Sequence, residues 1–136
     1  MVNVARIGLD VSVFFPSTSL LLQMAGWLRE SYPFYYRLIA ARQPMFIKDA
    51  LSSSASVIID ATERPDDATA VLELSVGQIG PHKTIVYTER MHEGLEVFAR
   101  TCGVQLLLGP MGEGEWRGFF ESLDRAKVTY GRRRGA

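Results

Sequence analysis

Residues 56–67 read SVIIDATERPDD, an apolar run that ends on a carboxylate and continues into a polar turn. Val57, Ile58 and Ile59 do not alternate with polar residues, which predicts a short strand buried on both faces. Asp60 stands at the end of that strand, and Pro65 marks the turn that follows. The rest of the chain decides whether Asp60 has a chemical role or organises a turn.

The same pattern of an apolar run followed by an amphipathic stretch occurs five times along the chain. Five strands are predicted, at about Ala5–Val13, Tyr35–Ala40, Ser56–Asp60, Lys83–Thr88 and Val104–Leu108. Five helices are predicted between and after them, at about Thr18–Ser31, Pro44–Ser53, Asp66–Val76, Met91–Cys102 and Glu113–Lys127. In the first helix Leu21, Met24, Ala25 and Leu28 form the expected core stripe, and Leu20, Leu22 and Trp27 lie off it.

Apolar strands that alternate with helices predict a parallel sheet covered on both sides, an α/β three-layer sandwich. Right-handed crossovers favour a doubly wound, five-stranded, flavodoxin-like sheet with strand order 2-1-3-4-5. In such sheets ligands bind beyond the carboxyl ends of the strands. The residues predicted to lie at that edge are Phe14, Phe15, Asp60, Thr88 and Gly109.

Composition predicts one domain in a reducing compartment. The chain has 136 residues, 47% of them hydrophobic, a formal net charge of zero and one cysteine. Zero net charge makes nucleic acid an improbable partner, and no apolar run is long enough to cross a membrane. We expect a cytoplasmic domain over residues 1–128, followed by a basic tail or linker start at 129–136 that contains Arg132–Arg134.

In order and spacing, the strand ends resemble those of receiver domains of bacterial two-component response regulators, the chemotaxis-type family. Asp60 corresponds to the phosphate-accepting aspartate of that family, and Thr88 to its Thr or Ser at the end of the fourth strand. Gly109-Pro110 resembles its Lys-Pro pair. The resemblance departs from the family at three points, one of which is Leu106 in place of the aromatic residue three positions before the family's lysine. Phe14 and Phe15 stand where receivers carry the acidic pair that holds Mg²⁺, and Gly109 replaces the lysine.

These replacements predict a degenerate site. Mg²⁺ prefers oxygen ligands, which phenyl rings lack, and phosphoryl transfer to a carboxylate needs positive charge to compensate the approaching anions. Each missing electrostatic donor typically costs about 2.7–4 kcal/mol in a transition state. We therefore expect no metal site, no cofactor and no enzymatic activity. Asp60 would serve mainly as a turn organiser, and Thr88 as a local hydrogen-bonding residue.

One arrangement could rescue the site. If the first strand stopped at Asp10, this carboxylate would be able to reach the pocket. Residues 11–15 contain no turn former and have high β propensity, which argues against that arrangement.

The favoured interpretation is a pseudo-receiver that acts as a protein-interaction or signal-relay module in a bacterial regulatory system. The resemblance implies a protein partner or a homodimer through the fourth and fifth helices, with Glu96, Val97 and Arg100 as candidate contacts. Two alternatives stay open. The first is an atypical receiver that is phosphorylated on Asp60, and the second is a flavodoxin-like domain that binds a small ligand.

Overall fold

The structure is a computed structural model and describes residues 10–29, 35–39, 43–54, 56–112, 114–119 and 122, with backbone alone at 10, 24–29 and 35–38. The predicted tail at 129–136 lies outside the described residues. The last predicted helix, Glu113–Lys127, is described only at 114–119 and 122, so Phe120 and Leu123 also lie outside the described residues.

Short strands and helices alternate along the chain. The strands are β1 (Asp10–Phe14), β2 (Tyr35–Ile39), β3 (Ser56–Asp60), β4 (Thr84–Thr88) and β5 (Gln105–Leu108). The helices are α1 (Thr18–Arg29), α2 (Pro44–Ser52), α3 (Pro65–Gln78), α4 (Glu93–Cys102) and the 3-10 turn η2 (Pro81–Lys83). Residues 114–119 are also helical.

The strands form a parallel sheet in the order β2-β1-β3-β4-β5. In its register Phe14 pairs with Ile59, and Asp60 pairs with Tyr87. The prediction of an α/β fold with a parallel sheet is confirmed. Because all strands run the same way, the loops after β1, β3, β4 and β5 meet at one edge of the sheet.

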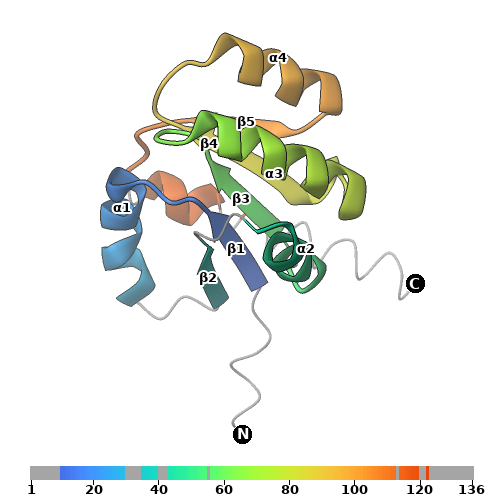
Figure 1. Cartoon of the computed structure of the whole chain (residues 1–136). Helices are drawn as coiled ribbons and strands as arrows, with labels where there is room; N and C mark the ends of the chain where they lie inside the picture. Colours follow the sequence, from blue (N-terminus) through green and yellow to red (C-terminus); the bar gives the residue numbers. More distant parts are fainter. Residues whose placement is uncertain are drawn as a thin grey trace, which may run out of the picture.

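Apolar side chains of the sheet divide into two clusters, one on each face. Alternate residues of a strand point to opposite faces, so Ile59 and Val86 join one cluster while Ile58 and Ile85 join the other. The first cluster is covered by α2, α3 and α4, and the second by α1 and segment 114–119. The result is three layers. Figure 1 shows α1 and the orange segment 114–119 on one side of the strands and α2 and α3 on the other.

Helix α1 begins where a serine caps it. The backbone N–H of Leu20 donates to Ser17 Oγ at 3.1 Å, as expected of an N-cap residue. The predicted core stripe is wrong at this end of the helix. Leu20 is fully buried against the second cluster, whereas Leu21 is 39% exposed and Leu22 73% exposed. The side chains of Met24, Ala25, Trp27 and Leu28 lie outside the described residues.

Helix α4 shows how local sequence signals set the ends of an element. It ends at Gly103, which adopts the left-handed φ of 76° expected of a glycine after a helix. Its start is later than predicted, at Glu93, so Met91 lies before the helix and is 61% exposed. Within the described part of the chain, no helix has the length and apolar character that crossing a membrane requires.

Candidate functional site

Asp60 is fully buried at the carboxyl end of β3. Its Oδ2 accepts the backbone N–H of Ser17 at 2.8 Å, and its Oδ1 accepts the backbone N–H of Thr62 at 2.9 Å. Both carboxylate oxygens therefore hold loop amides. One of these amides follows its own strand, and the other belongs to the residue that caps α1.

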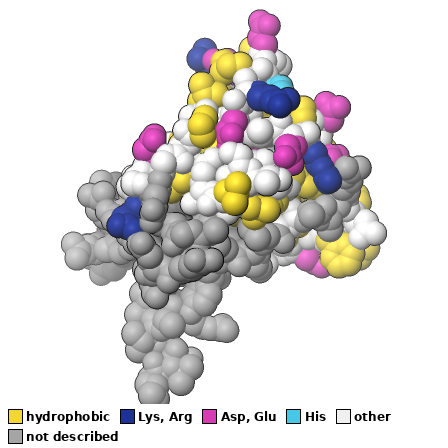
Figure 2. Space-filling model, turned by 90° about the vertical axis from the view of Figure 1, so that its left-hand side faces the viewer, with side chains coloured by type: hydrophobic (Ala, Val, Ile, Leu, Met, Phe, Trp, Pro, Cys, Tyr) yellow, Lys and Arg dark blue, Asp and Glu magenta, His cyan; other side chains and the backbone are white. Residues whose placement is uncertain are grey.

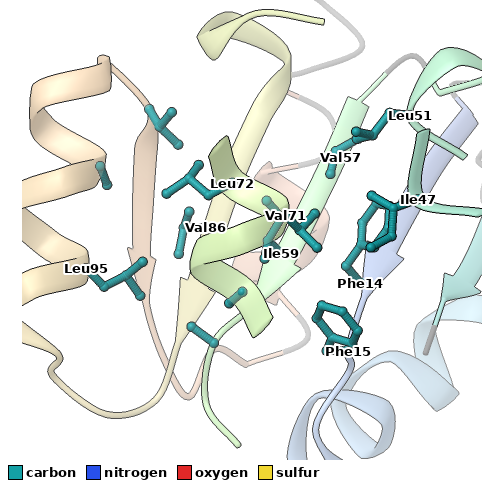
Figure 3. Close-up of a cluster of buried hydrophobic side chains, with 14 residues drawn as sticks. Phe14, Phe15, Ile47, Leu51, Val57, Ile59, Val71, Leu72, Val86 and Leu95 are labelled. Atoms are coloured by element: carbon teal, nitrogen blue, oxygen red, sulfur yellow. The ribbon is translucent and has the colours of Figure 1, made fainter. Parts of the chain in front are cut away.

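Phe14 and Phe15, at the positions of the expected acidic pair, are both buried in the first cluster. Their rings meet edge to face, with centroids 6.2 Å apart. Figure 3 shows both rings among the side chains that α2, α3 and β3 contribute to this cluster. The two residues thus supply core volume and offer no oxygen ligand.

The backbone at Phe15 explains why two successive residues share one cluster. In a continuing strand, Phe15 would point to the opposite face from Phe14. Instead Phe15 adopts a φ of 54°, in the left-handed region that bulky residues rarely occupy. Its N–H still bonds the carbonyl of Ile39 at 2.8 Å. The chain turns at this point, and the second ring joins the first.

The arrangement in which the first strand stops at Asp10, which the sequence disfavoured, does not occur. β1 begins at Asp10 and continues to Phe14, so this residue lies at the amino end of the strand. Its register partner is Tyr35, and the next residue, Val11, pairs with Ser56, the first residue of β3. Asp10 and Asp60 are therefore at opposite ends of the strands, five residues apart along the strand direction, which is about 16 Å at about 3.3 Å per residue.

Thr88 is buried at the end of β4 and engages its own turn. Its Oγ1 donates to the carbonyl of Arg90 at 2.8 Å and lies 3.2 Å from the backbone nitrogen of Arg90, which donates to it. The neighbouring N–H, that of Glu89, donates to Thr62 Oγ1 at 3.0 Å. The loops after β3 and β4 are thus tied together.

Gly109 and Pro110 follow β5 and are joined by a cis peptide bond. Gly109 N–H donates to the carbonyl of Thr88 at 2.8 Å. A Cβ at this position would lie 2.6 Å from both Cε1 and Cζ of Tyr87, and its hydroxyl would be closer still. Real Cβ contacts of this length essentially never occur, so the Tyr87 phenol takes the space that a side chain at position 109 would need.

Tyr87 and Gln23 form a polar network that the sequence did not predict. The phenol donates to Glu89 Oε2 at 2.6 Å, and Gln23 Nε2 donates to the same oxygen at 2.9 Å. Gln23 Oε1 accepts the indole N–H of Trp116 at 2.9 Å and the backbone N–H of Met111 at 3.3 Å. One glutamine amide therefore links α1, the end of β4 and segment 114–119.

This environment shifts two acid groups in opposite directions. Burial, followed by the hydrogen bond to Glu89, raises the pKa of Tyr87 well above its ordinary value of 10.0, and the charge of nearby Asp60 adds to the shift. Burial also acts to raise the pKa of Glu89. Hydrogen bonds from Tyr87, Ser19 and Gln23 outweigh it, so the pKa of Glu89 is lowered from 4.5. Both shifts favour a neutral phenol that donates to an ionised carboxylate.

The donor set at this edge does not fit a magnesium ion. Mg²⁺ requires near-octahedral oxygen ligation, commonly through carboxylates, together with substrate phosphate. Asp60 offers one carboxylate, and its two oxygens already accept N–H bonds. Across the described ranges, no group of three or more His, Cys, Asp or Glu side chains is arranged to hold a metal.

A groove of about 520 Å³ lies between the first turns of α3 and α4. Its lining consists of Pro65, Asp66, Thr69, His92, Glu93, Gly94 and Leu95. None of the predicted site residues is among them. Carboxylates at both helix starts line the groove, so it is unsuited to an anion.

The predicted partner residues lie on α4. Val97 is 59% exposed, and Arg100 donates to Glu96 across one helical turn at 2.7 Å. Figure 2 shows acidic and basic side chains interspersed over one face of the described part of the molecule, with no broad area of one sign.

Comparisons with known proteins show the fold. No family model matches the sequence, and no curated protein matches it. A pilus assembly-related protein of Burkholderia pseudomallei K96243 superposes with a TM-score of 0.61 at 18% identity, over 88% of this chain and 90% of that one. The BeF3-activated receiver domain of DrrB gives 0.62 at 12% identity, over 88% and 97%. The chain therefore has a receiver-like fold.

A third structure, CapF with the inhibitor 3-isopropenyl-tropolone, has a TM-score of 0.53 at 10% identity. The match covers 73% of this chain and 29% of that one. This chain therefore resembles one part of a larger protein.

Proposed function

We propose that this chain is a degenerate receiver that works as a protein-interaction or signal-relay module of a bacterial regulatory system, in the cytoplasm and without Mg²⁺-dependent aspartyl phosphorylation. The observation that carries this proposal is the buried Asp60 carboxylate, both of whose oxygens accept backbone N–H groups. A carboxylate held in this way organises two loops and is poorly placed to attack phosphorus. The module has no catalytic activity of its own and no cofactor.

The missing charges support the same proposal. A phosphoryl group that approached Asp60 would meet no lysine at position 109, where Tyr87 fills the space. It would also find no carboxylate at positions 14 and 15 to hold a cation, because both are buried phenylalanines. Losing charge compensation from both sources lowers the rate of phosphoryl transfer by several orders of magnitude.

Phosphorylation is tested directly by incubating the protein with Mg²⁺ and acetyl phosphate and measuring its intact mass. We expect no phosphoryl adduct, while a receiver with an intact acidic pair, treated in parallel, gains one. An adduct that forms on the wild type and is absent in Asp60→Asn would establish the atypical phosphorylatable receiver instead. Beryllofluoride titration followed by NMR is an independent check, with no change expected in the amide signals of Asp60 and Thr62.

Helix α4 is the surface proposed to bind the partner, either another protein or a second copy of this chain. Val97 presents an exposed apolar side chain there, flanked by the Glu96–Arg100 pair. A pilus assembly-related protein has a similar fold, and a role in an assembly is proposed here by analogy of fold alone.

Sedimentation velocity over a range of concentrations tests self-association. Val97→Asp is expected to weaken it, whereas Leu22→Asp, at another exposed apolar position but on α1, leaves it unchanged. If the wild type is monomeric throughout, the same two variants are compared in binding to proteins encoded beside this one. Equal behaviour of both variants would reject α4 as the contact.

A further inference from the structure

Tyr87 is held by a contact between its ring and Trp116 and by hydrogen bonds at its hydroxyl. Its side chain is fully buried, and its ring lies 5.2 Å from that of Trp116, centroid to centroid. The hydroxyl donates to Glu89 at 2.6 Å and lies 3.2 Å from Gln23 Nε2, which donates to it. Rotation of the phenol out of this position would break these bonds inside a buried environment, where unpaired polar groups are costly.

The position of the phenol relative to Asp60 follows from the sheet. Asp60 and Tyr87 are register partners on neighbouring parallel strands, so their side chains point to the same face. The Asp60 charge also contributes to raising the pKa of Tyr87. The phenol therefore lies on the same face of the sheet as the Asp60 carboxylate, and its ring occupies the space next to Gly109.

We propose that Tyr87 is a built-in plug, which fills the space next to Gly109 and keeps this edge of the sheet closed. Gln23 and Glu89 are its positioning residues. Because Gln23 also binds Trp116 and Met111, the plug fixes α1 and segment 114–119 relative to β4. This inference deepens the proposed function, but it rests on the packing of Tyr87 rather than on the absence of phosphorylation.

A double-mutant cycle between positions 87 and 109 tests the plug. In the wild type, Gly109→Ala forces a Cβ into the phenol, and we expect the melting temperature to fall by about 5 °C or more. In a Tyr87→Leu background the ring atoms are gone, so the same Gly109→Ala change should lower the melting temperature by less than about 2 °C. Equal effects in the two backgrounds would overturn the proposal.

Gly112→Ala is the matched control in the same loop. A Cβ there has its nearest neighbour at 3.6 Å, the Oε1 of Glu115, which is an ordinary contact. We expect it to change the melting temperature equally and slightly in both backgrounds. A large effect at Gly112 would show that the loop resists substitution in general, and would remove the support for the plug.

Tyr87→Phe separates volume from hydrogen bonding, and loss of the Gly109→Ala penalty in this background would show that the ring does not fill the space next to Gly109. The ring carbons that a Cβ at 109 would strike remain, so the penalty of Gly109→Ala persists in this background. The indole N–H signal of Trp116, observed by NMR, reports the network: Gln23→Leu should shift it, because the acceptor is removed. An unshifted indole signal would show that Gln23 does not hold the network.

Each result can be read separately from the phosphorylation test. A phosphoryl adduct on Asp60 would reject the proposed function, but the coupling measured between positions 87 and 109 would still stand. If the effects of the substitutions at 87 and 109 were additive, the plug would be rejected, but the result of the phosphorylation test would still stand.

Discussion

Ser17 donates its backbone N–H to Asp60 Oδ2 at 2.8 Å across 43 residues of sequence. The same serine caps α1 through its hydroxyl. The carboxylate at the end of β3 is therefore joined to the start of α1, and together with Thr62 it closes the loops at this edge of the sheet. Its contacts are those of a residue that stabilises the fold.

Removing this carboxylate should destabilise the protein. Asp60→Ala leaves the N–H groups of Ser17 and Thr62 without their acceptor, at about 1–3 kcal/mol for each buried group. We expect the free energy of unfolding, measured by urea denaturation, to fall by at least about 2 kcal/mol. Asp49→Asn, at an exposed position of α2, should stay within about 0.5 kcal/mol of the wild type. An Asp60→Ala protein as stable as the wild type would contradict the structural role.

The left-handed backbone at Phe15 should reverse the usual order of stability, in which an alanine variant is more stable than a glycine variant. Both substitutions lose the buried ring, but at a φ of 54° alanine also suffers a steric cost of about 1–2 kcal/mol that glycine avoids. We therefore expect Phe15→Gly to be more stable than Phe15→Ala. Phe14, within β1, is the control: there glycine should be less stable than alanine by about 0.5–1 kcal/mol. The same order at both positions in urea denaturation would count against the left-handed turn.

Acid should weaken the polar network through Glu89. The pKa of Glu89 is lowered in the folded state, so its contribution to stability is present above 4.5 and is lost as the pH falls through the folded value. Urea denaturation of the wild type and Glu89→Gln at a series of pH values should show a stability difference that shrinks on acidification. Glu63→Gln, at an exposed position, is the control for the effect of removing a carboxylate outside the network. A difference that grows on acidification would mean that the sign of the shift is wrong.

Alkaline pH should destabilise the protein through Tyr87, just as acidic pH does through Glu89. The pKa of Tyr87 is raised above 10.0, chiefly by burial and then by its hydrogen bond to Glu89. Its contribution to stability is complete below 10.0 and is lost as the pH rises toward the folded value. In a tyrosinate absorbance titration, Tyr87 should ionise later than an ordinary tyrosine and together with unfolding. Tyr87→Phe should lack this late component. An early, fully reversible titration of Tyr87 would contradict its buried placement.

The sequence was informative wherever a structural signal is local. Unbroken apolar runs such as Val57–Ile59 indicate strands buried on both faces, and the alternation of such runs with amphipathic stretches indicates an α/β fold with a parallel sheet. Gly103 marks the end of α4 because few other residues tolerate its left-handed backbone. The absence of acids at positions 14 and 15, and of a lysine at position 109, can be read directly from the residue types.

Other features depend on segments that only the folded chain brings together. Leu20 rather than Leu21 enters the core because the cap at Ser17 and the packing of α1 on the sheet set the rotation of the helix. Side-chain periodicity leaves that rotation ambiguous when three leucines follow one another.

From the residues alone, then, follow the class of fold and the absence of acids at positions 14 and 15 and of a lysine at position 109. Tertiary structure decided what surrounds this edge of the sheet: the N–H groups of Ser17 and Thr62 on the oxygens of Asp60, and the Tyr87 ring next to Gly109. The physical reason is that periodicity and backbone preference act within a few residues, whereas hydrogen-bond partners and excluded volume are set by which loops the sheet order brings to one edge.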